Sequence, residues 1–236
     1  MQIIYEDNHL IVVSKTCHEI VQGDKTGDEP LGETLKRLIK ERDLKPGNVF
    51  LGVTHRLDRP TTGVVIFAKT SKALERVNRM FAQGEIHKTY WCITPNVWNA
   101  EQSVGRKGGL PQKEADLKNW LVRNEKQNRS IAYDKEVPNS KEARLHYKVI
   151  ATTDRYALIE VQLFTGRHHQ IRCQLSHIGL TIKGDLKYGA PRSNPDGGIS
   201  LHSRKANFIH PVSKEEITIV APVPEDNLWK ALTSLL

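Results

Sequence analysis

Cysteine is scarce in this sequence, and the few that occur exclude two common kinds of site. The three cysteines, Cys17, Cys92 and Cys173, lie far apart, and no Cys-x-x-Cys pair occurs among the 236 residues. That pattern excludes a zinc knuckle and a redox-active dithiol. We therefore expect three small buried thiols.

Long apolar runs are missing as well. No stretch approaches the ~20 consecutive apolar residues that a membrane helix needs. The first 14 residues lack the basic start and the extended apolar run of a secretory signal. Both absences predict a cytoplasmic protein that does not enter membranes.

Several familiar catalytic and nucleotide-binding motifs are absent too. No Gly-x-Gly-x-x-Gly follows a predicted strand, and no Gly-x-Ser-x-Gly elbow occurs. The stretch Gly63 to Thr70 ends in Lys-Thr, as phosphate-binding loops do, but Ala68 stands where such a loop requires glycine. The histidines His168, His169 and His177 have no carboxylate or cysteine at ligand spacing, so no metal site is expected.

Acidic residues are outnumbered by basic ones. There are 35 Lys and Arg against 27 Asp and Glu, which gives a net charge of +8 and a pI of about 9.4. This balance is typical of proteins that meet phosphate, although many basic proteins bind none. The length favours one domain over residues 1–236. Residues 99–142, which include the basic, glycine-rich stretch 105–109, are interpreted as a variable insertion that either contributes to substrate choice or is solvated surface.

Periodicity predicts a chain of mixed strands and helices. Strands are predicted from alternation and from β-branched or aromatic content at 3–5, 10–14, 64–68, 87–94, 145–149, 156–164 and 217–220. Helices are predicted where apolar residues recur at spacings of three and four, at 31–39, 71–84, 171–179 and 228–235. In the second helix Ser71 is the expected N-cap and Gly84 the expected end.

The stretch from Thr54 to Thr70 organises the rest of the chain. It is a charged turn followed by the apolar run Val64 to Ala68, and a loop on a buried strand can hold a reactive side chain still. Asp58 lies between Arg56 and Arg59, whose guanidinium groups would favour its ionised form. An ionised Asp58 can attack as a nucleophile, or it can simply anchor an arginine.

Two later segments also combine reactive side chains with predictable structure. Lys88-Thr89-Tyr90 lies in a predicted strand, where a lone tyrosine is usually a core residue. Residues Thr165 to Leu175 read Thr-Gly-Arg-His-His-Gln-Ile-Arg-Cys-Gln-Leu at a strand-to-helix corner. Backbone N–H groups and Arg167 at such a corner make a natural anion site.

These three segments, in this order, resemble the motifs of the RluA-type pseudouridine synthases. Residues 55–63 match the family's His-Arg-Leu-Asp-x-x-Thr-Ser-Gly, with Thr62 in place of the serine. The two later segments match its Lys-x-Tyr and Thr-Gly-Arg-x-His-Gln-Ile/Leu-Arg. The chain departs at Lys15 to His18, where Lys-Thr-Cys-His replaces Lys-Pro-x-Gly. Nothing precedes the first hairpin, so we expect no S4-type RNA-binding domain in front.

The resemblance implies a fold and a set of site residues. The implied fold is of α/β (α+β) type, a large, mostly antiparallel mixed sheet flanked by helices with a basic catalytic cleft. The implied catalytic residues are Asp58 as nucleophile, Tyr90 against the target base, and Arg172 paired with Asp58. The residues expected to bind RNA are His55, Arg56, Arg59, Thr62, Lys88, Arg167 and Gln170, with Arg56 filling the place of a flipped-out base.

The resemblance also implies the reaction, which is isomerisation of uridine to pseudouridine in structured tRNA or rRNA. No cofactor is expected because the atoms are only rearranged, and the protein is expected to be a monomer. Two alternatives use the same residues. One is a non-catalytic RNA-binding protein of the same fold, and the other is a nucleoside hydrolase or RNA glycosylase that would release free uracil.

Overall fold

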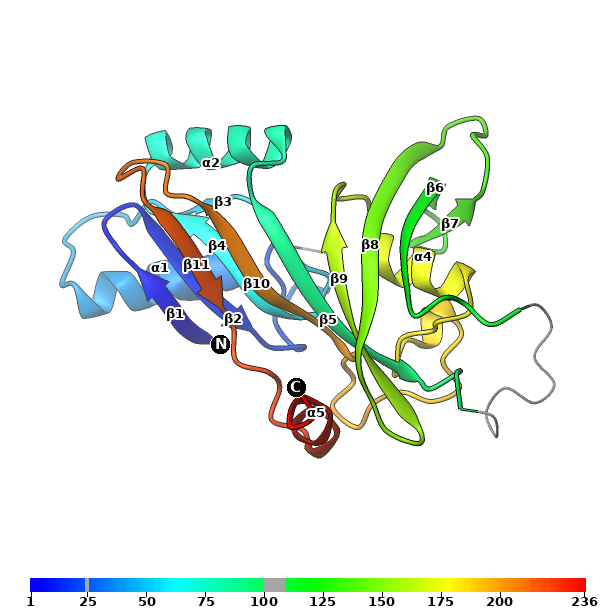
Figure 1. Ribbon diagram of the computed structural model, residues 1–236. Coiled ribbons are helices and arrows are strands. Elements are labelled where there is room, and N and C mark those ends of the chain that lie inside the picture. Colours follow the sequence, from blue (N-terminus) through cyan, green and yellow to red (C-terminus); the bar gives the residue numbers. More distant parts are fainter. Residues whose placement is uncertain (24–25, 100–108) are drawn as a thin grey trace. The chain divides into compact units, whose positions relative to one another are not determined.

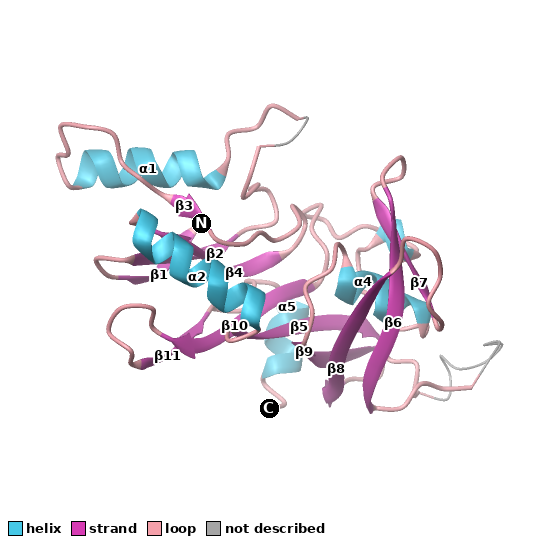
Figure 2. Cartoon of the chain, turned by 90° about the horizontal axis from the view of Figure 1, so that it is seen from above, coloured by secondary structure: helices cyan, strands magenta, loops and turns pink. Residues whose placement is uncertain are grey.

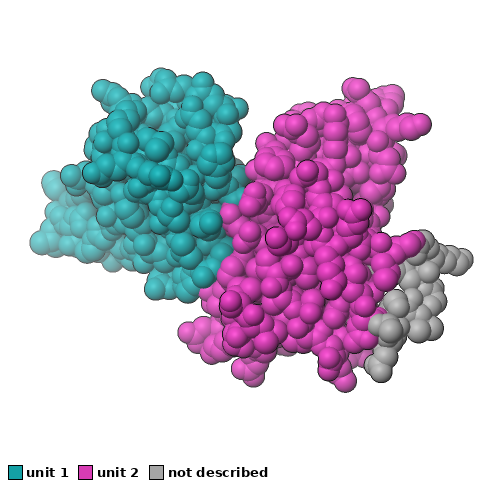
Figure 3. All heavy atoms as spheres, in the orientation of Figure 1, with its two compact units in different colours: residues 1–88, 203–222 teal, residues 89–202, 223–236 magenta. Residues whose placement is uncertain are grey.

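The computed structural model of the protein describes residues 1–23, 26–99 and 109–236. The chain forms two compact units, which Figure 3 colours separately. Unit 1 comprises Met1–Lys88 and Ser203–Pro222, and unit 2 comprises Thr89–His202 and Val223–Leu236. Whether they act as the single domain expected from the length stays a prediction.

Unit 1 contains a sheet whose strand order is β1-β2-β4-β10 (Figure 1). Its strands are β1 (Gln2–Glu6), β2 (Leu10–Lys15), β3 (Gly52–Val53), β4 (Thr62–Ala68), β10 (Leu201–Ile209) and β11 (Glu216–Val220). β3 pairs with β4, and β11 pairs with β10. The predicted first hairpin is confirmed, since β1 and β2 are antiparallel. Its turn is closed by Asp7, whose carboxylate accepts hydrogen bonds from the N–H groups of His9 and Leu10.

Two long helices of unit 1, α1 (Leu31–Arg42) and α2 (Ser71–Gln83), can be followed in Figure 2. Both were predicted, and Gly84 ends α2 in the left-handed conformation as expected. The expected N-cap, Ser71, is wrong by one residue. Thr70 keeps an extended backbone, and its side chain accepts a hydrogen bond from the Ala73 N–H at 3.1 Å, so Ser71 is already helical.

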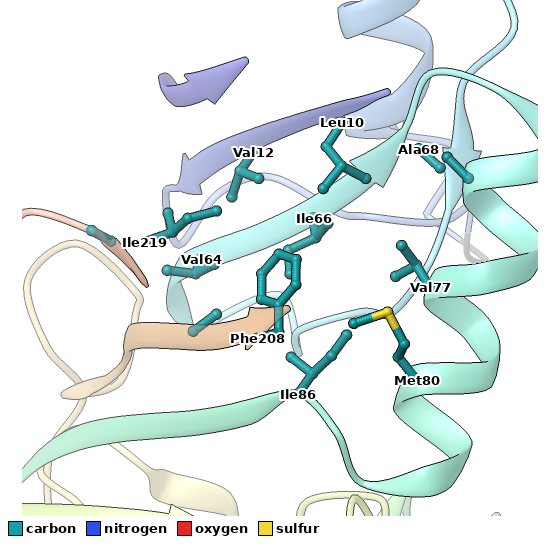
Figure 4. Close-up of a cluster of buried hydrophobic side chains, with 13 residues drawn as sticks. Leu10, Val12, Val64, Ile66, Ala68, Val77, Met80, Ile86, Phe208 and Ile219 are labelled. Atoms are coloured by element: carbon teal, nitrogen blue, oxygen red, sulfur yellow. The ribbon is translucent and has the colours of Figure 1, made fainter. Parts of the chain in front are cut away.

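The two helices cover opposite faces of β4. Val64, Ile66 and Ala68 point toward α2 and share a buried cluster with its Val77 and Met80 and with Phe208 of β10 (Figure 4). Phe67 points to the other face. There its ring lies beside Gly32 of α1, where a Cβ would be 3.7 Å from the ring. β4 is therefore buried on both faces, which explains its uninterrupted apolar sequence.

Unit 2 contains an antiparallel sheet in the order β5-β9-β8-β6-β7. Its strands are β5 (His87–Pro95), β6 (Glu114–Asn124), β7 (Arg129–Tyr133), β8 (Lys141–Thr152) and β9 (Tyr156–Leu163). β6 and β7 fall in the segment interpreted as an insertion, so residues 114–133 extend the sheet. The basic stretch 105–108 lies outside the described residues.

In the described part of unit 2, the helical segments are α4 (Gln170–His177), the short 3₁₀ turn η1 (Leu186–Tyr188) and α5 (Asn227–Thr233). Cys173 of α4 and Tyr188 of η1 pack on Leu121 and Ala143 of the sheet. The three cysteine side chains are buried, as predicted, and burial raises the pKa of Cys173 to about 12. Within the described ranges, no helix is long and apolar enough to cross a membrane.

Candidate active site

The charged turn of unit 1 is fixed to the strand that follows it. The Thr54 hydroxyl donates to the Ile66 carbonyl at 2.6 Å, and His55 Nε2 accepts from the Ile66 N–H at 3.0 Å. Leu57 is buried in the core while Asp58 is half-buried. The Thr61 N–H donates to the Asp58 carbonyl at 3.0 Å. The backbone that carries Asp58 is therefore held on both sides.

Two further features restrain the same turn. Gly63 has a φ of +108°, and a Cβ at this position would overlap the backbone of Ser203. Lys15 is almost fully buried, and its ammonium donates to the carbonyls of Thr16 and Arg59 at 2.7 and 2.8 Å. Burial lowers the pKa of Lys15 to about 8, against the smaller opposing effects of nearby acidic groups that include Asp58. Neither restraint was predicted from the sequence.

The arginines on either side of Asp58 reach the loop that precedes α1. Arg59 forms an ion pair with Asp28 at 2.6 Å and donates to the Thr26 hydroxyl at 2.7 Å. Arg56 is exposed and donates to the Gln22 side chain at 3.5 Å. The expected contact of these guanidinium groups with the Asp58 carboxylate stays a prediction.

His55 and Lys88 both lie close to one aromatic ring in unit 1. The His55 and Phe81 ring centroids are 4.8 Å apart, and the Lys88 ammonium lies 5.3 Å from the Phe81 centroid. Burial, and to a smaller extent the charge of Lys88, lowers the pKa of His55 to about 3. Burial also lowers the pKa of Lys88. Thr62, the first residue of β4, is half-buried.

Tyr90 in unit 2 lies in β5, opposite Val161 of β9, and is 6% exposed. Its burial agrees with either a core role or the floor of a site. Its role against a target base stays a prediction.

The Thr-Gly-Arg corner of unit 2 is held by one amide side chain. Gln170 Oε1 accepts hydrogen bonds from the Thr165 hydroxyl at 2.8 Å and from the Arg167 N–H at 2.9 Å. Its Nε2 donates to the Arg144 carbonyl at 3.0 Å. The exposed Arg167 donates through Nε to the Glu142 carbonyl at 2.9 Å. Gln170 therefore shapes the corner, while Arg167 presents a charge on it.

Arg172 lies in α4 and forms a buried ion pair within unit 2. Its Nε and Nη2 donate to the two carboxylate oxygens of Asp185 at 2.7 and 2.8 Å. Asp185 was not among the predicted site residues. The pairing of Arg172 with Asp58 stays a prediction.

Each of the three clustered histidines contacts other side chains of the protein. His168 contacts the Ser130 hydroxyl and Asn128, His169 contacts the Tyr188 hydroxyl, and His177 contacts Asp134. Across the part of the chain that the structure describes, no group of three or more His, Cys, Asp or Glu could hold a metal ion.

Comparison with known proteins establishes the family. The family model for RNA pseudouridylate synthase matches residues 9–177, well over half of the chain. The chain therefore belongs to the RNA pseudouridylate synthase family, and the RluA-type resemblance is confirmed. It is an RNA pseudouridine synthase, an isomerase with an RNA substrate.

The relatives are similar along nearly all of this chain. Ribosomal large subunit pseudouridine synthase C of Vibrio cholerae serotype O1 is 29% identical over 99% of this chain and 69% of its own length. An uncharacterized RNA pseudouridine synthase of Chlorobaculum parvum is 32% identical over 95% of this chain and 71% of its own length. The tRNA pseudouridine synthase C of Vibrio cholerae serotype O1 is 29% identical over 99% of this chain and 95% of its own length.

A solved structure shows the same fold. Human RNA Pseudouridylate Synthase Domain Containing 4 matches with a TM-score of 0.75 at 24% identity, over 97% of this chain and 90% of that one. The predicted α+β pseudouridine synthase fold is confirmed.

Proposed function

We propose that this enzyme converts a uridine in a structured tRNA or rRNA to pseudouridine, with Asp58 as the nucleophile. Arg172 would hold the Asp58 carboxylate and Tyr90 would lie against the uracil. Relatives named for the large ribosomal subunit and for tRNA support these two RNA classes. We further propose that the enzyme is a cytoplasmic monomer.

The observation that carries the assignment of Asp58 is the fixation of its turn. Thr54 and His55 both hydrogen-bond to the backbone of Ile66, in a strand buried on both faces. A nucleophile held in one position loses little entropy when it attacks, and this lowers the barrier to reaction. The half-buried carboxylate keeps access to a substrate.

A carboxylate suits this isomerisation because the bond it forms is labile. Attack by Asp58 would give an ester-type or acylal-type link that can be released again. During the reaction the N1–C1′ bond breaks, the uracil rotates, and a C5–C1′ bond forms. N1 gains a proton and C5 loses one, so the product has the mass of the substrate.

The target uridine must leave its stack to reach Asp58, at a cost of a few kcal/mol. Arg56 is the proposed occupant of the vacated place. Its exposure and its long 3.5 Å hydrogen bond to Gln22 suit a side chain that changes position.

Lys88 and Arg167 are the proposed phosphate contacts. Burial lowers the pKa of Lys88. An approaching phosphate would oppose that shift, because a nearby anion stabilises the charged form of the side chain. Arg167 is exposed at a corner that Gln170 holds rigid. We propose that His55, Arg59, Thr62 and Gln170 act mainly by shaping the surface on which RNA lies.

The product of the reaction tests the proposal. Total tRNA and rRNA from cells with and without the gene would be mapped for carbodiimide-reactive bases, and RNA lacking the modification would be treated with the purified protein. We expect one or a few uridines to be converted without a change of mass, and Asp58→Asn to lose at least about 10³-fold in rate. Free uracil would indicate a glycosylase instead. If the maps from cells with and without the gene were identical, and the purified protein bound the RNA without changing it, the protein would be non-catalytic.

A further inference from the structure

Arg172 is held by an acid from its own unit. The Asp185 carboxylate accepts two parallel hydrogen bonds from it, and the side chains of Arg172 and Asp185 are only 5% and 1% exposed. Such a fork fixes the plane of a guanidinium group as well as its position. Arg172 therefore has a defined orientation before any substrate binds.

A tyrosine ring supports the same guanidinium from another side. The Arg172 guanidinium carbon is 5.2 Å from the Tyr188 ring centroid. The Tyr188 hydroxyl accepts a hydrogen bond from the Ser130 N–H at 2.7 Å and lies 3.0 Å from His169 Nδ1. The ring cannot move without disturbing both contacts, so it limits the motion of Arg172 as well.

The backbone of Asp185 is fixed in turn. Its N–H donates to the Ile182 carbonyl at 3.1 Å, and its own carbonyl accepts from the Ala190 N–H at 3.0 Å. Gly184 has a φ of +86°, and a Cβ there would overlap the Asn194 side chain. This turn therefore holds the carboxylate of Asp185 in one place.

Stability alone is a weak reason for such a buried pair. Removing two charges from water costs about as much as their attraction returns, and apolar pairs often replace them without loss. A fixed direction is what the ion pair supplies and an apolar pair does not. Two of the five N–H groups of Arg172 donate to Asp185, and a guanidinium group held in this way can orient more than one carboxylate.

We propose that Asp185 and Tyr188 are positioning residues, which orient Arg172 and through it the nucleophile Asp58. This inference rests on the proposed function, in which Arg172 pairs with Asp58. Loss of Asp185 or Tyr188 should slow the turnover of bound RNA and leave RNA affinity largely unchanged, because neither side chain needs to touch the substrate.

Steady-state kinetics of three variants test the inference. Asp185→Asn keeps the shape and one acceptor oxygen but loses the charge. Misplacing a catalytic group by about 1 Å costs roughly 10²-fold, so we expect kcat to fall by about that factor while KM stays within about 3-fold. Arg172→Lys should also lower kcat. The double variant should be no slower than Arg172→Lys alone, because Asp185 acts through Arg172.

Two outcomes would overturn the inference. One is an unchanged kcat in a folded Asp185→Asn protein, and the other is a double variant in which the two losses multiply as independent effects. Gln174→Leu is the matched control, since Gln174 is a fully buried polar residue of α4 that bonds to Asn119 and the Ala143 carbonyl. We expect it to lower stability and leave kcat unchanged.

A measurement on the unaltered protein covers the case in which Asp185→Asn does not fold. The Nε proton of Arg172, whose NMR signal is assigned by its loss in Arg172→Lys, should exchange slowly with water. Its chemical shift should differ from those of the exposed arginines. Rapid exchange would overturn the inference. The proposed function is tested separately by Asp58→Asn: if that protein stays fully active, the proposed nucleophile is wrong whatever Asp185 does.

Discussion

His55 accepts, through Nε2, the hydrogen bond that the backbone N–H of Ile66 donates over 3.0 Å. A ring nitrogen that accepts a hydrogen bond carries no proton, so His55 is neutral in the folded protein. Burial is the main reason that the pKa of His55 is lowered to about 3. The first turn of the active site is thus tied to β4 by a group that resists protonation.

This histidine should make the protein sensitive to acid. In the unfolded chain His55 takes up a proton near pH 6.5, while the folded protein does not until about pH 3. Between those values the unfolded state binds the extra proton, so the free energy of unfolding falls by up to ~1.4 kcal/mol for each unit of decreasing pH. We expect His55→Gln, whose amide oxygen can still accept from Ile66, to remove that slope.

Urea unfolding followed by circular dichroism at several pH values between 7 and 4 measures this slope. His177→Gln is the control, because His177 pairs with Asp134 at the surface of unit 2. If His55→Gln and the unaltered protein lose stability equally on acidification, the neutral state of His55 is not the cause.

Two glycines with positive φ should respond very differently to alanine. Gly63→Ala places a Cβ in the backbone of Ser203 at a φ of +108°, and we expect a loss of about 3 kcal/mol in stability and at least tenfold in activity. Gly84→Ala, at a φ of +74°, has nothing within 4 Å of the new Cβ and should cost only about 1 kcal/mol. Equal losses in thermal unfolding would show that φ alone matters and that the close approach does not.

The N-terminus of α2 gives a third prediction. Thr70→Ala removes the side chain that caps the Ala73 N–H and should cost about 1 kcal/mol. Ser71→Ala, at the first helical residue, should be within about 0.5 kcal/mol of neutral. Chemical denaturation of the two variants ranks them, and a larger loss for Ser71→Ala would contradict the observed cap.

The same helix shows what could be predicted from the sequence. The spacing of apolar residues and Gly84 were enough to predict α2, because a helix depends on its own neighbours in the chain. Threonine and serine both make good caps, so the choice between Thr70 and Ser71 depended on where the extended backbone of β4 gives way. Patterns over a few residues predicted the existence of elements better than their ends.

Contacts between distant residues were harder to predict. The motif that contains Arg172 was recognised, but nothing in the local pattern distinguished Asp185 from other acids in turns. The restraint of the Asp58 turn by Lys15 likewise joins residues more than 40 positions apart. Such pairs depend on how the strands are ordered, and apolar periodicity does not encode that order.

Arg167 gives the last prediction, which concerns RNA binding. A phosphate contact releases counterions, so each one adds about 0.7–0.9 to the slope of log affinity against log salt. We expect Arg167→Gln to weaken RNA binding, to reduce that slope by about one contact, and to leave kcat at saturating RNA unchanged. Arg37→Gln is the control, because Arg37 is exposed on α1 but already pairs with Glu29 through two hydrogen bonds. Filter binding from 50 to 300 mM salt separates the two, and a slope that is unchanged in Arg167→Gln would remove Arg167 from the RNA-binding surface.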